Sequence, residues 1–262
     1  MGKKDVTQKI FWEDNARFAD LFNVVLGKGE IVLRPEELTK EESKVLEIVK
    51  KENNKTFIEK YRDVIKKVTM DMTCFLIGIE NQSDVNYAMP LRVMLWDALS
   101  YQEQIRNLER RHKGNGELTS GAEFLSGIKK EDKLKPVCTI VVYYNEKEWD
   151  GSRNLHELLD WNGIPEYMRE WIADYPMILV DVFRFPDWEK FRTDLREVFG
   201  FIQCSQDMNK MKFFLEDNAE RFSSMTEKAC DLIEEVTGTK KSDSFEKNRK
   251  RGSKICVRQW MI

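Results

Sequence analysis

Residues 61–83 read YRDVIKKVTMDMTCFLIGIENQS. Asp63 stands at the head of one short apolar run, and Glu80 stands at the tail of the next. The second run, residues 75–79, is bulky, apolar and bounded by polar residues, which is typical of a strand buried on both faces. The first run is also short and compatible with a strand, so the stretch predicts a β-hairpin. In this hairpin Asp63 and Glu80 would lie near the same end of neighbouring strands.

Two carboxylates at the end of a buried sheet are costly unless they are paired, hydrogen-bonded or bound to a cation. Asp63 and Glu80 offer the oxygen ligands that Mg²⁺ or Mn²⁺ prefers, and magnesium commonly takes only one or two protein carboxylates. Such a cation can activate water for attack on a phosphodiester. Gln82 could orient that water or contact a phosphate. A purely structural interpretation stays open, in which the two acids cap strands or pair with Arg62 and Lys66.

The composition of the chain sets limits on its partners. At 262 residues, the chain is long enough for one large domain, with or without a smaller addition. A hydrophobic fraction of 41%, with seven Trp and fifteen Phe, is enough for a substantial core. Because the net charge is −3, nucleic-acid binding would need a local basic patch or a metal that screens phosphates.

Several classes of protein are excluded by missing motifs. The five cysteines form no CxxC pair and there are only two histidines, which argues against a Cys/His zinc site and against a disulfide scaffold. Neither histidine has a Ser or Cys placed to form a catalytic triad, and there is no P-loop or GxGxxG. The sequence begins with no signal peptide and has no apolar run that could span a bilayer. We therefore expect a protein of the reducing cytoplasm with no membrane partner.

The remaining pattern predicts helices alternating with strands. Pro90 suits the first turn of a helix, and the polar segment 109–135 is expected to be an exposed, mobile insertion. The other predicted elements are a helix over 7–26, an exposed helix after a turn at Pro35, strands over 136–144 and 177–183, a short helix around 155–161, and helices over 187–236. This order predicts an α/β fold with a mixed sheet wrapped by helices.

The C-terminal tail is strongly basic. Residues 240–258 contain eight Lys or Arg and only two acidic residues. Such a cluster can bind nucleic acid, although solubility alone explains it more simply.

The pattern D-x(16)-E-x-Q, from Asp63 to Gln82, resembles the PD-(D/E)XK nuclease superfamily, with Gln82 where lysine is commoner. A closer likeness is to the Rpn family, described as recombination-promoting nuclease or putative transposase. Four blocks over roughly residues 5–200 carry this resemblance: FADLFN (18–23), LIGIENQS (76–83), YAMPLRVMLWDALSY (87–101) and WDGSRNLHELL (149–159).

The resemblance implies a restriction-endonuclease-like mixed β-sheet flanked by helices. A nuclease-like domain would occupy residues 1–200, and a helical extension with the basic tail would occupy residues 201–262. Asp63 and Glu80 would be the metal ligands, and Gln82 would stand in place of the motif lysine.

The resemblance also implies an acid on the first helix that completes the metal site. Asp20 is our choice over Glu13 and Asp14. The helix after the glutamate strand would supply DNA contacts through three residues. These are Arg92, Tyr101 and Gln102. A core position for Tyr101 and a surface ion pair for Arg92 are the alternatives.

The predicted function is therefore a Mg²⁺- or Mn²⁺-dependent DNA endonuclease associated with recombination or mobile elements. A second hypothesis is a catalytically idle nuclease fold that binds DNA or protein, because the motif lysine is missing and the net charge is negative. A third is an oligomeric scaffold built on the aromatic-rich helices, although a core role explains those aromatic residues more simply. The second and third hypotheses leave homo-oligomerisation open.

Overall fold

A five-stranded mixed sheet forms the centre of the molecule, in the order β1-β4-β5-β6-β7. The strands β1, β4 and β5 are antiparallel neighbours, whereas β6 and β7 run parallel to β5. The computed structural model describes residues 3–40, 44–51, 54–61, 63–70 and 73–239. The strands of the sheet are β1 (Leu38–Lys40), β4 (Val64–Met70), β5 (Thr73–Gln82), β6 (Val137–Tyr143) and β7 (Ile178–Asp181). The predicted α/β class with a mixed sheet is confirmed.

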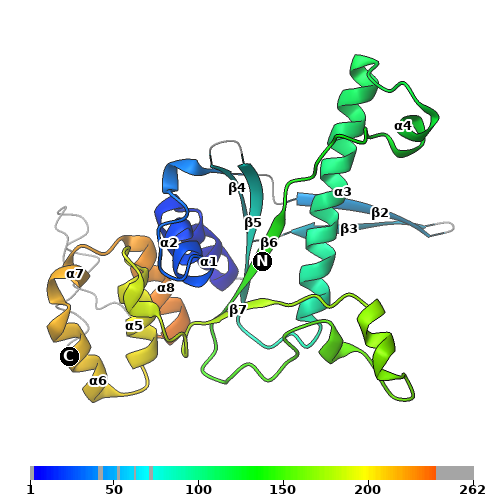
Figure 1. The fold of residues 1–262 in the computed structure, drawn as a ribbon. Coiled ribbons are helices and arrows are strands. Elements are labelled where there is room, and N and C mark those ends of the chain that lie inside the picture. Colours follow the sequence, from blue (N-terminus) through cyan, green and yellow to red (C-terminus); the bar gives the residue numbers. More distant parts are fainter. Residues whose placement is uncertain (1–2, 41–43, 52–53, 62, 71–72, 240–262) are drawn as a thin grey trace.

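Helices cover the two faces of this sheet unequally (Figure 1). On one face, the larger core packs the sheet against α1, α2, α5 and α8. On the other face, a smaller core packs α3 against β6. The helices are α1 (Lys3–Trp12), α2 (Asn15–Val25), α3 (Met89–Asn115), α4 (Gly121–Ser126), α5 (Leu195–Cys204), α6 (Met208–Asp217), α7 (Ala219–Ser223) and α8 (Glu227–Thr237).

The N-terminal helix predicted over residues 7–26 is in fact two helices, and that prediction was wrong. The first helix ends at Trp12, and Asp14 caps the second, because its side chain accepts a hydrogen bond from the backbone N–H of Arg17. Lys66 of β4 stabilises the break between the two helices by hydrogen bonds from the sheet. Its Nζ donates to the Glu13 carbonyl at 2.9 Å and to Asn15 Oδ1 at 2.7 Å.

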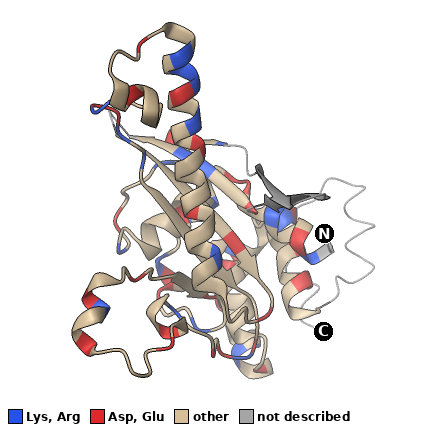
Figure 2. Cartoon of the chain, turned by 90° about the vertical axis from the view of Figure 1, so that its right-hand side faces the viewer, with Lys and Arg blue, Asp and Glu red and all other residues tan. Residues whose placement is uncertain are grey.

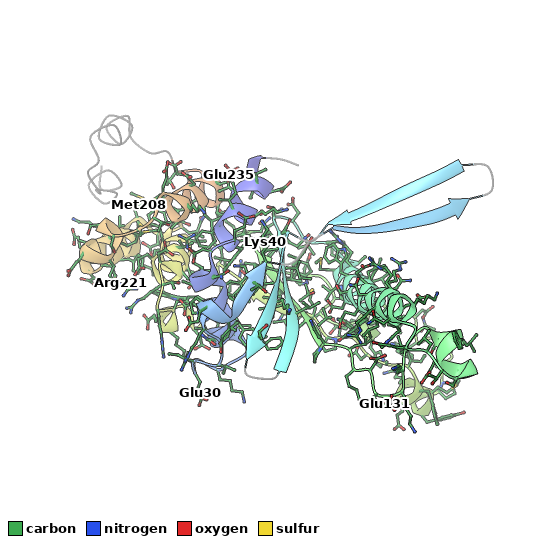
Figure 3. All side chains as sticks on the ribbon, turned by 90° about the horizontal axis from the view of Figure 1, so that it is seen from above. Glu30, Lys40, Glu131, Met208, Arg221 and Glu235 are labelled. Atoms are coloured by element: carbon green, nitrogen blue, oxygen red, sulfur yellow. The ribbon has the colours of Figure 1, made fainter. Side chains whose placement is uncertain are left out.

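The exposed helix predicted after Pro35 is also wrong. A short 3₁₀ turn over Pro35–Glu37 is followed by β1 and then by an antiparallel ribbon of β2 (Lys44–Lys51) and β3 (Asn54–Tyr61). The ribbon extends away from the body of the protein when viewed from above (Figure 3). The sequence of β2, KVLEIVKK, explains the difference, because its β-branched residues favour strands although lysine and glutamate favour helices.

The hairpin predicted from residues 61–83 is confirmed. Strands β4 and β5 are antiparallel, with Val64 opposite Ile79. Because side chains alternate along a strand, Ile77 and Ile79 enter the larger core, and Glu80 and Gln82 share the opposite face, toward α3.

Helix α3 begins with Pro90 in its first turn, as predicted, but it is longer than expected. Residues 109–115 are helical, and the segment beyond them contains α4, so only part of the predicted insertion lacks regular structure. The helix ends at Gly116, whose φ of 63° suits glycine. Both basic and acidic residues lie along the projecting end of α3 (Figure 2), which is typical of a solvated helix rather than of a single-sign binding surface.

The C-terminal elements follow the prediction closely. Strands β6 and β7 lie within the predicted ranges, the short helix is a 3₁₀ turn at His156–Leu158, and residues 187–236 are largely helical. The boundary predicted at residue 200 falls inside α5, and α8 packs on both α1 and α5. The basic tail at 240–258 lies outside the described residues. No helix in the described ranges is long and apolar enough to cross a membrane.

Candidate active site

Asp63 lies immediately before β4, at the end of the sheet where β5 finishes. Its Oδ2 accepts two hydrogen bonds from Asn81, one from the backbone N–H at 2.7 Å and one from the side-chain amide at 3.1 Å. Burial raises the pKa of the Asp63 carboxyl, and the two hydrogen bonds from Asn81 only partly oppose this effect. The charges of Asp5 and Lys9 on α1 also act on this carboxyl.

Asn81 connects Asp63 to the N-terminal helix through a buried hydrogen-bond network. The indole N–H of Trp12 lies 3.0 Å from Asn81 Oδ1 and 2.8 Å from the hydroxyl of Tyr144. Tyr144 is buried, which raises the pKa of its hydroxyl and keeps that group neutral. The sequence offered no sign of this network, since Trp12 and Tyr144 read only as core residues.

Glu80 lies on the other face of β5 and is 4% exposed. Its Oε1 is 3.1 Å from Nη2 of Arg92 on α3 and 3.3 Å from Nε2 of Gln82 on the same strand. A buried carboxylate is tolerated only with such partners. The Arg92 guanidinium also lies over the Trp96 ring, 4.6 Å from its centroid. The structure thus brings together Glu80, Gln82 and Arg92, three residues of the predicted site, and Arg92 forms an ion pair with Glu80.

The two acids reach the end of the sheet from opposite sides. The Asp63 carboxylate is held by Asn81, whose side chain faces α1, whereas the Glu80 carboxylate is held by Arg92 of α3. A cation bound by both acids would therefore be placed at the strand ends rather than over either face.

Asp20 does not join these residues. It is 6% exposed, and its Oδ2 accepts hydrogen bonds from the backbone N–H groups of Arg192 and Thr193, at 2.9 and 2.8 Å, and from the Thr193 hydroxyl at 2.7 Å. These bonds anchor the segment that leads into α5. Within the described part of the chain, no three His, Cys, Asp or Glu side chains form a group that could hold a metal ion. Asp20 therefore does not form a three-acid cluster with Asp63 and Glu80.

The other two residues predicted to contact DNA lie farther along α3. Tyr101 is nine residues beyond Arg92, which corresponds to about 14 Å along the helix axis. Its hydroxyl accepts a hydrogen bond from the Val137 N–H at 3.0 Å, at the start of β6. The neighbouring Gln102 is exposed. Neither residue contacts Glu80 or Gln82 through a hydrogen bond of the described residues.

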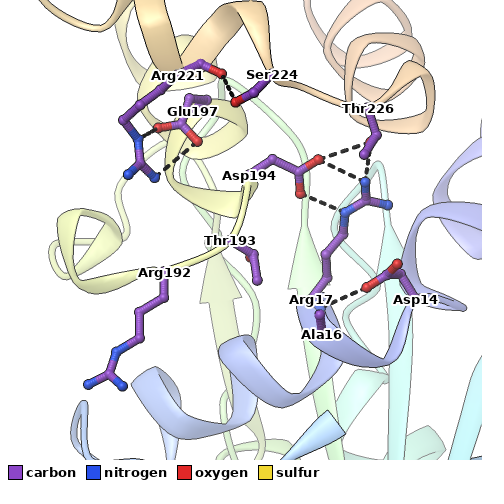
Figure 4. A pocket seen from close by; sticks show the side chains of 10 residues that line it. All are labelled: Asp14, Ala16, Arg17, Arg192, Thr193, Asp194, Glu197, Arg221, Ser224 and Thr226. Carbon is purple, nitrogen blue, oxygen red and sulfur yellow. Dashed lines mark hydrogen bonds and ion pairs between the residues drawn. The ribbon is translucent and has the colours of Figure 1, made fainter.

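A polar cavity of about 360 Å³ lies elsewhere in the molecule, where the N-terminal ends of α2, α5 and α8 meet (Figure 4). Arg17, which is 2% exposed, binds both carboxylate oxygens of Asp194, at 2.7 and 2.8 Å. Arg221 pairs with Glu197 in the same cavity. The lining residues are Asp14, Ala16, Arg17, Arg192, Thr193, Asp194, Glu197, Arg221, Ser224 and Thr226. Because most of these charges are paired with one another, we assign the cavity a structural role.

By its fold, this is an α/β protein with a mixed sheet. Two acids and a glutamine lie at the end of the antiparallel hairpin in that sheet. A family model described as "Putative transposase, YhgA-like" matches residues 52–232, which is well over half of the chain. The chain belongs to this family, which associates it with mobile elements and suggests binding to DNA. Neither a curated protein nor a solved structure matches the chain.

Proposed function

We propose that the protein is a Mg²⁺- or Mn²⁺-dependent DNA endonuclease with a restriction-endonuclease-like core, as the resemblance to the Rpn family implies. The observation that carries this proposal is the register of β4 and β5, which places Asp63 beside the Glu80-x-Gln82 segment. After the crossover through α3, strand β6 pairs in parallel with β5, and this pairing supports the site. Membership of a transposase family supports DNA as the substrate.

The donor set fits a hard divalent cation. Asp63 and Glu80 would each supply carboxylate oxygens, and two protein carboxylates are enough for magnesium. When bound, the cation would supply Lewis acidity and an activated water for phosphodiester hydrolysis. Gln82 cannot act as a charged base, so its role in this proposal is to orient the water or contact a phosphate by hydrogen bonding.

The roles that we propose for three residues of α3 depend on their distance from Glu80. Arg92 would contact the phosphate next to the bond that is cut. Gln102, exposed farther along the helix, would contact DNA beyond that point. Tyr101 would act indirectly, because its hydroxyl positions the start of β6. Asp20 would bind the cation only if its hydrogen bonds to residues 192–193 were broken.

Cleavage of supercoiled plasmid tests the proposal. With Mg²⁺ or Mn²⁺, the wild-type protein should nick or linearise the plasmid, and EDTA should stop the reaction. Asp63→Ala and Glu80→Ala should each lower the rate by at least about a hundredfold, because each removes a ligand of a cation that contributes several kcal/mol. Glu216→Ala, at an exposed acid on α6, is the matched control and should cut at the wild-type rate. Equal cutting by all three variants would rule out this site.

Two observations favour the idle nuclease fold as the second candidate. Both Gln82 and Arg92 already bind Glu80 Oε1, and the raised pKa of Asp63 disfavours its charged form. A calorimetric titration with Mn²⁺ separates the two candidates. The enzyme should show a binding heat that disappears in Glu80→Ala, whereas the idle fold should show none.

A further inference from the structure

Arg92 is placed between a buried carboxylate and solvent. The side chain of Glu80 is 5% exposed, but that of Arg92 is 40% exposed. The guanidinium is steadied by the Trp96 ring beneath it. Arg92 therefore stands at the outer side of Glu80, where a ligand approaching the carboxylate would meet it.

The contact between Arg92 and Glu80 uses only a small part of the guanidinium. It is a single Nη2–Oε1 contact at 3.1 Å, whereas Arg17 binds Asp194 through two nitrogens at 2.7 and 2.8 Å. Arg92 makes no other hydrogen bond or ion pair with the described residues. Since a guanidinium carries five N–H donors, Arg92 retains donors for a second, anionic ligand.

The Glu80 carboxylate that Arg92 contacts is also a ligand of the proposed cation. A positive guanidinium and a divalent cation that approach one carboxylate oxygen compete for it and repel each other. Arg92 cannot remain on Oε1 while a cation takes that position. A DNA phosphate beside the site would offer Arg92 a second partner, one that matches its fork-shaped geometry.

We infer that Arg92 has two positions: it neutralises Glu80 when neither DNA nor cation is bound, and it moves to a DNA phosphate when DNA binds, which leaves Glu80 open to the cation. This inference rests on the proposed function. It adds a coupling between the two ligands, because DNA would remove the competitor of the cation. By thermodynamic linkage, the cation would raise the affinity for DNA by the same factor.

Mn²⁺ affinity without DNA, measured by calorimetry, gives the first test. Arg92→Met should bind Mn²⁺ about tenfold more tightly than the wild type, because the competing charge is removed. Arg92→Lys keeps a positive charge and should stay within about twofold of the wild type. Arg169→Met is the matched control, because Arg169 also lies over a tryptophan ring, that of Trp161, at 4.9 Å. It should leave Mn²⁺ affinity unchanged.

DNA affinity, measured in EDTA by fluorescence anisotropy of a labelled duplex, gives the second test. Arg92→Met and Arg92→Lys should both weaken binding, and Arg92→Met should lower the slope of log affinity against log salt by about one. Arg169→Met should not change it. If Arg92→Met is poorly folded by circular dichroism, Arg92→Gln replaces it, since glutamine retains an amide donor toward Glu80.

The results separate this inference from the proposed function. Mn²⁺ binding that depends on Glu80 but is equal or weaker in the neutral Arg92 variants overturns the two-position role alone, and so does an unchanged affinity for DNA. If the wild type and the variants bind no Mn²⁺ at all, the proposed function fails and the coupling fails with it. Tighter Mn²⁺ binding with weaker DNA binding in the same neutral variant is the result that supports it.

Discussion

At the scale of single residues, Asn81 opposes the effect of burial on the pKa of Asp63. It donates two hydrogen bonds to Asp63 Oδ2, and both favour the charged carboxylate against the effect of burial. Trp12 in turn holds the Asn81 side chain. The sequence motif identifies Asp63 and Glu80, but it contains nothing that reveals the dependence of Asp63 on a neighbour of Glu80.

We expect Asn81→Ala to shift the pH dependence of cation binding. The variant loses the side-chain hydrogen bond and keeps the backbone one, so the pKa of Asp63 should rise further. Because a cation needs the deprotonated carboxylate, Mn²⁺ affinity should fall off at higher pH in the variant than in the wild type. Mn²⁺ titrations across a pH series would measure this, with Asn209→Ala on α6 as control. Superimposable pH profiles would contradict the assignment of Asn81 as a positioning residue.

Lys66 is the second residue with an unusual environment. It is 2% exposed on β4, with its Nζ bound to the Glu13 carbonyl and to Asn15, near the Phe18 ring. Burial lowers the pKa of Lys66 to about 8. The charged form is therefore disfavoured in the folded protein compared with the unfolded chain.

The stability of the wild type relative to Lys66→Met should rise with pH. Between a folded pKa of about 8 and the unfolded value of 10.5, the unfolded chain binds more protons at this site, so the free energy of unfolding increases with pH. The expected gain from pH 7 to pH 10 is about 2 kcal/mol. Urea unfolding of both proteins at several pH values would measure it. If the free energies of unfolding of the two proteins change with pH in parallel, Lys66 is charged and its pKa is not lowered by folding.

At the scale of elements, one arginine joins the beginnings of three helices. Asp14 is the N-cap of α2, Asp194 of α5 and Thr226 of α8, and Arg17 binds both Asp194 and Thr226 (Figure 4). Asp194 makes no side-chain capping bond to α5, because its oxygens are used by Arg17 and Thr226. The ion pair thus fixes helices that are far apart in the sequence.

Arg17→Met should destabilise the protein by about 3–5 kcal/mol, because it leaves Asp194 without its partner in a mostly buried position. Chemical unfolding would measure this loss. Arg110→Met removes the exposed ion pair with Glu103 and should cost no more than about 1 kcal/mol. Similar losses in the two variants would show that Arg17 is not the link between these helices.

Local sequence patterns predict some elements well and others poorly. The apolar runs around Asp63 and Glu80 specify a hairpin because alternation and length act locally. The helix predicted after Pro35 is wrong because the segment carries mixed signals. Lysine and glutamate suit a helix, whereas Val45, Ile48 and Val49 suit a strand. Asp14 at a helix start was a readable signal for the break between α1 and α2.

At the scale of the whole molecule, the larger core runs through both halves of the chain. Phe199 and Phe201 of α5, and Leu232 and Ile233 of α8, are buried in the same cluster as α1 and the sheet. The helices beyond residue 201 are therefore packed into this core and not only attached to its surface.

A chain that ends after Cys204 should lose cooperative thermal unfolding, because removal of α8 exposes the apolar surfaces of α1 and α5 to water. A chain that ends after Thr239 retains every described helix and should keep cooperative unfolding. Calorimetry of the two truncated proteins would measure this. Cooperative unfolding of the shorter chain at the full-length temperature would instead support an independent domain over residues 1–200.

The sequence by itself determined the central hairpin, the placing of Asp63 and Glu80 at the same end of it, and the helix that begins at Pro90. These features depend on periodicity and on residues that are close in the chain. Only the tertiary structure decided which partners these residues have: Asn81 for Asp63, Arg92 for Glu80, and the amides of Arg192 and Thr193 for Asp20. Asp20 and Arg192 are 172 positions apart, and contacts over such distances come from packing, which a local pattern does not encode.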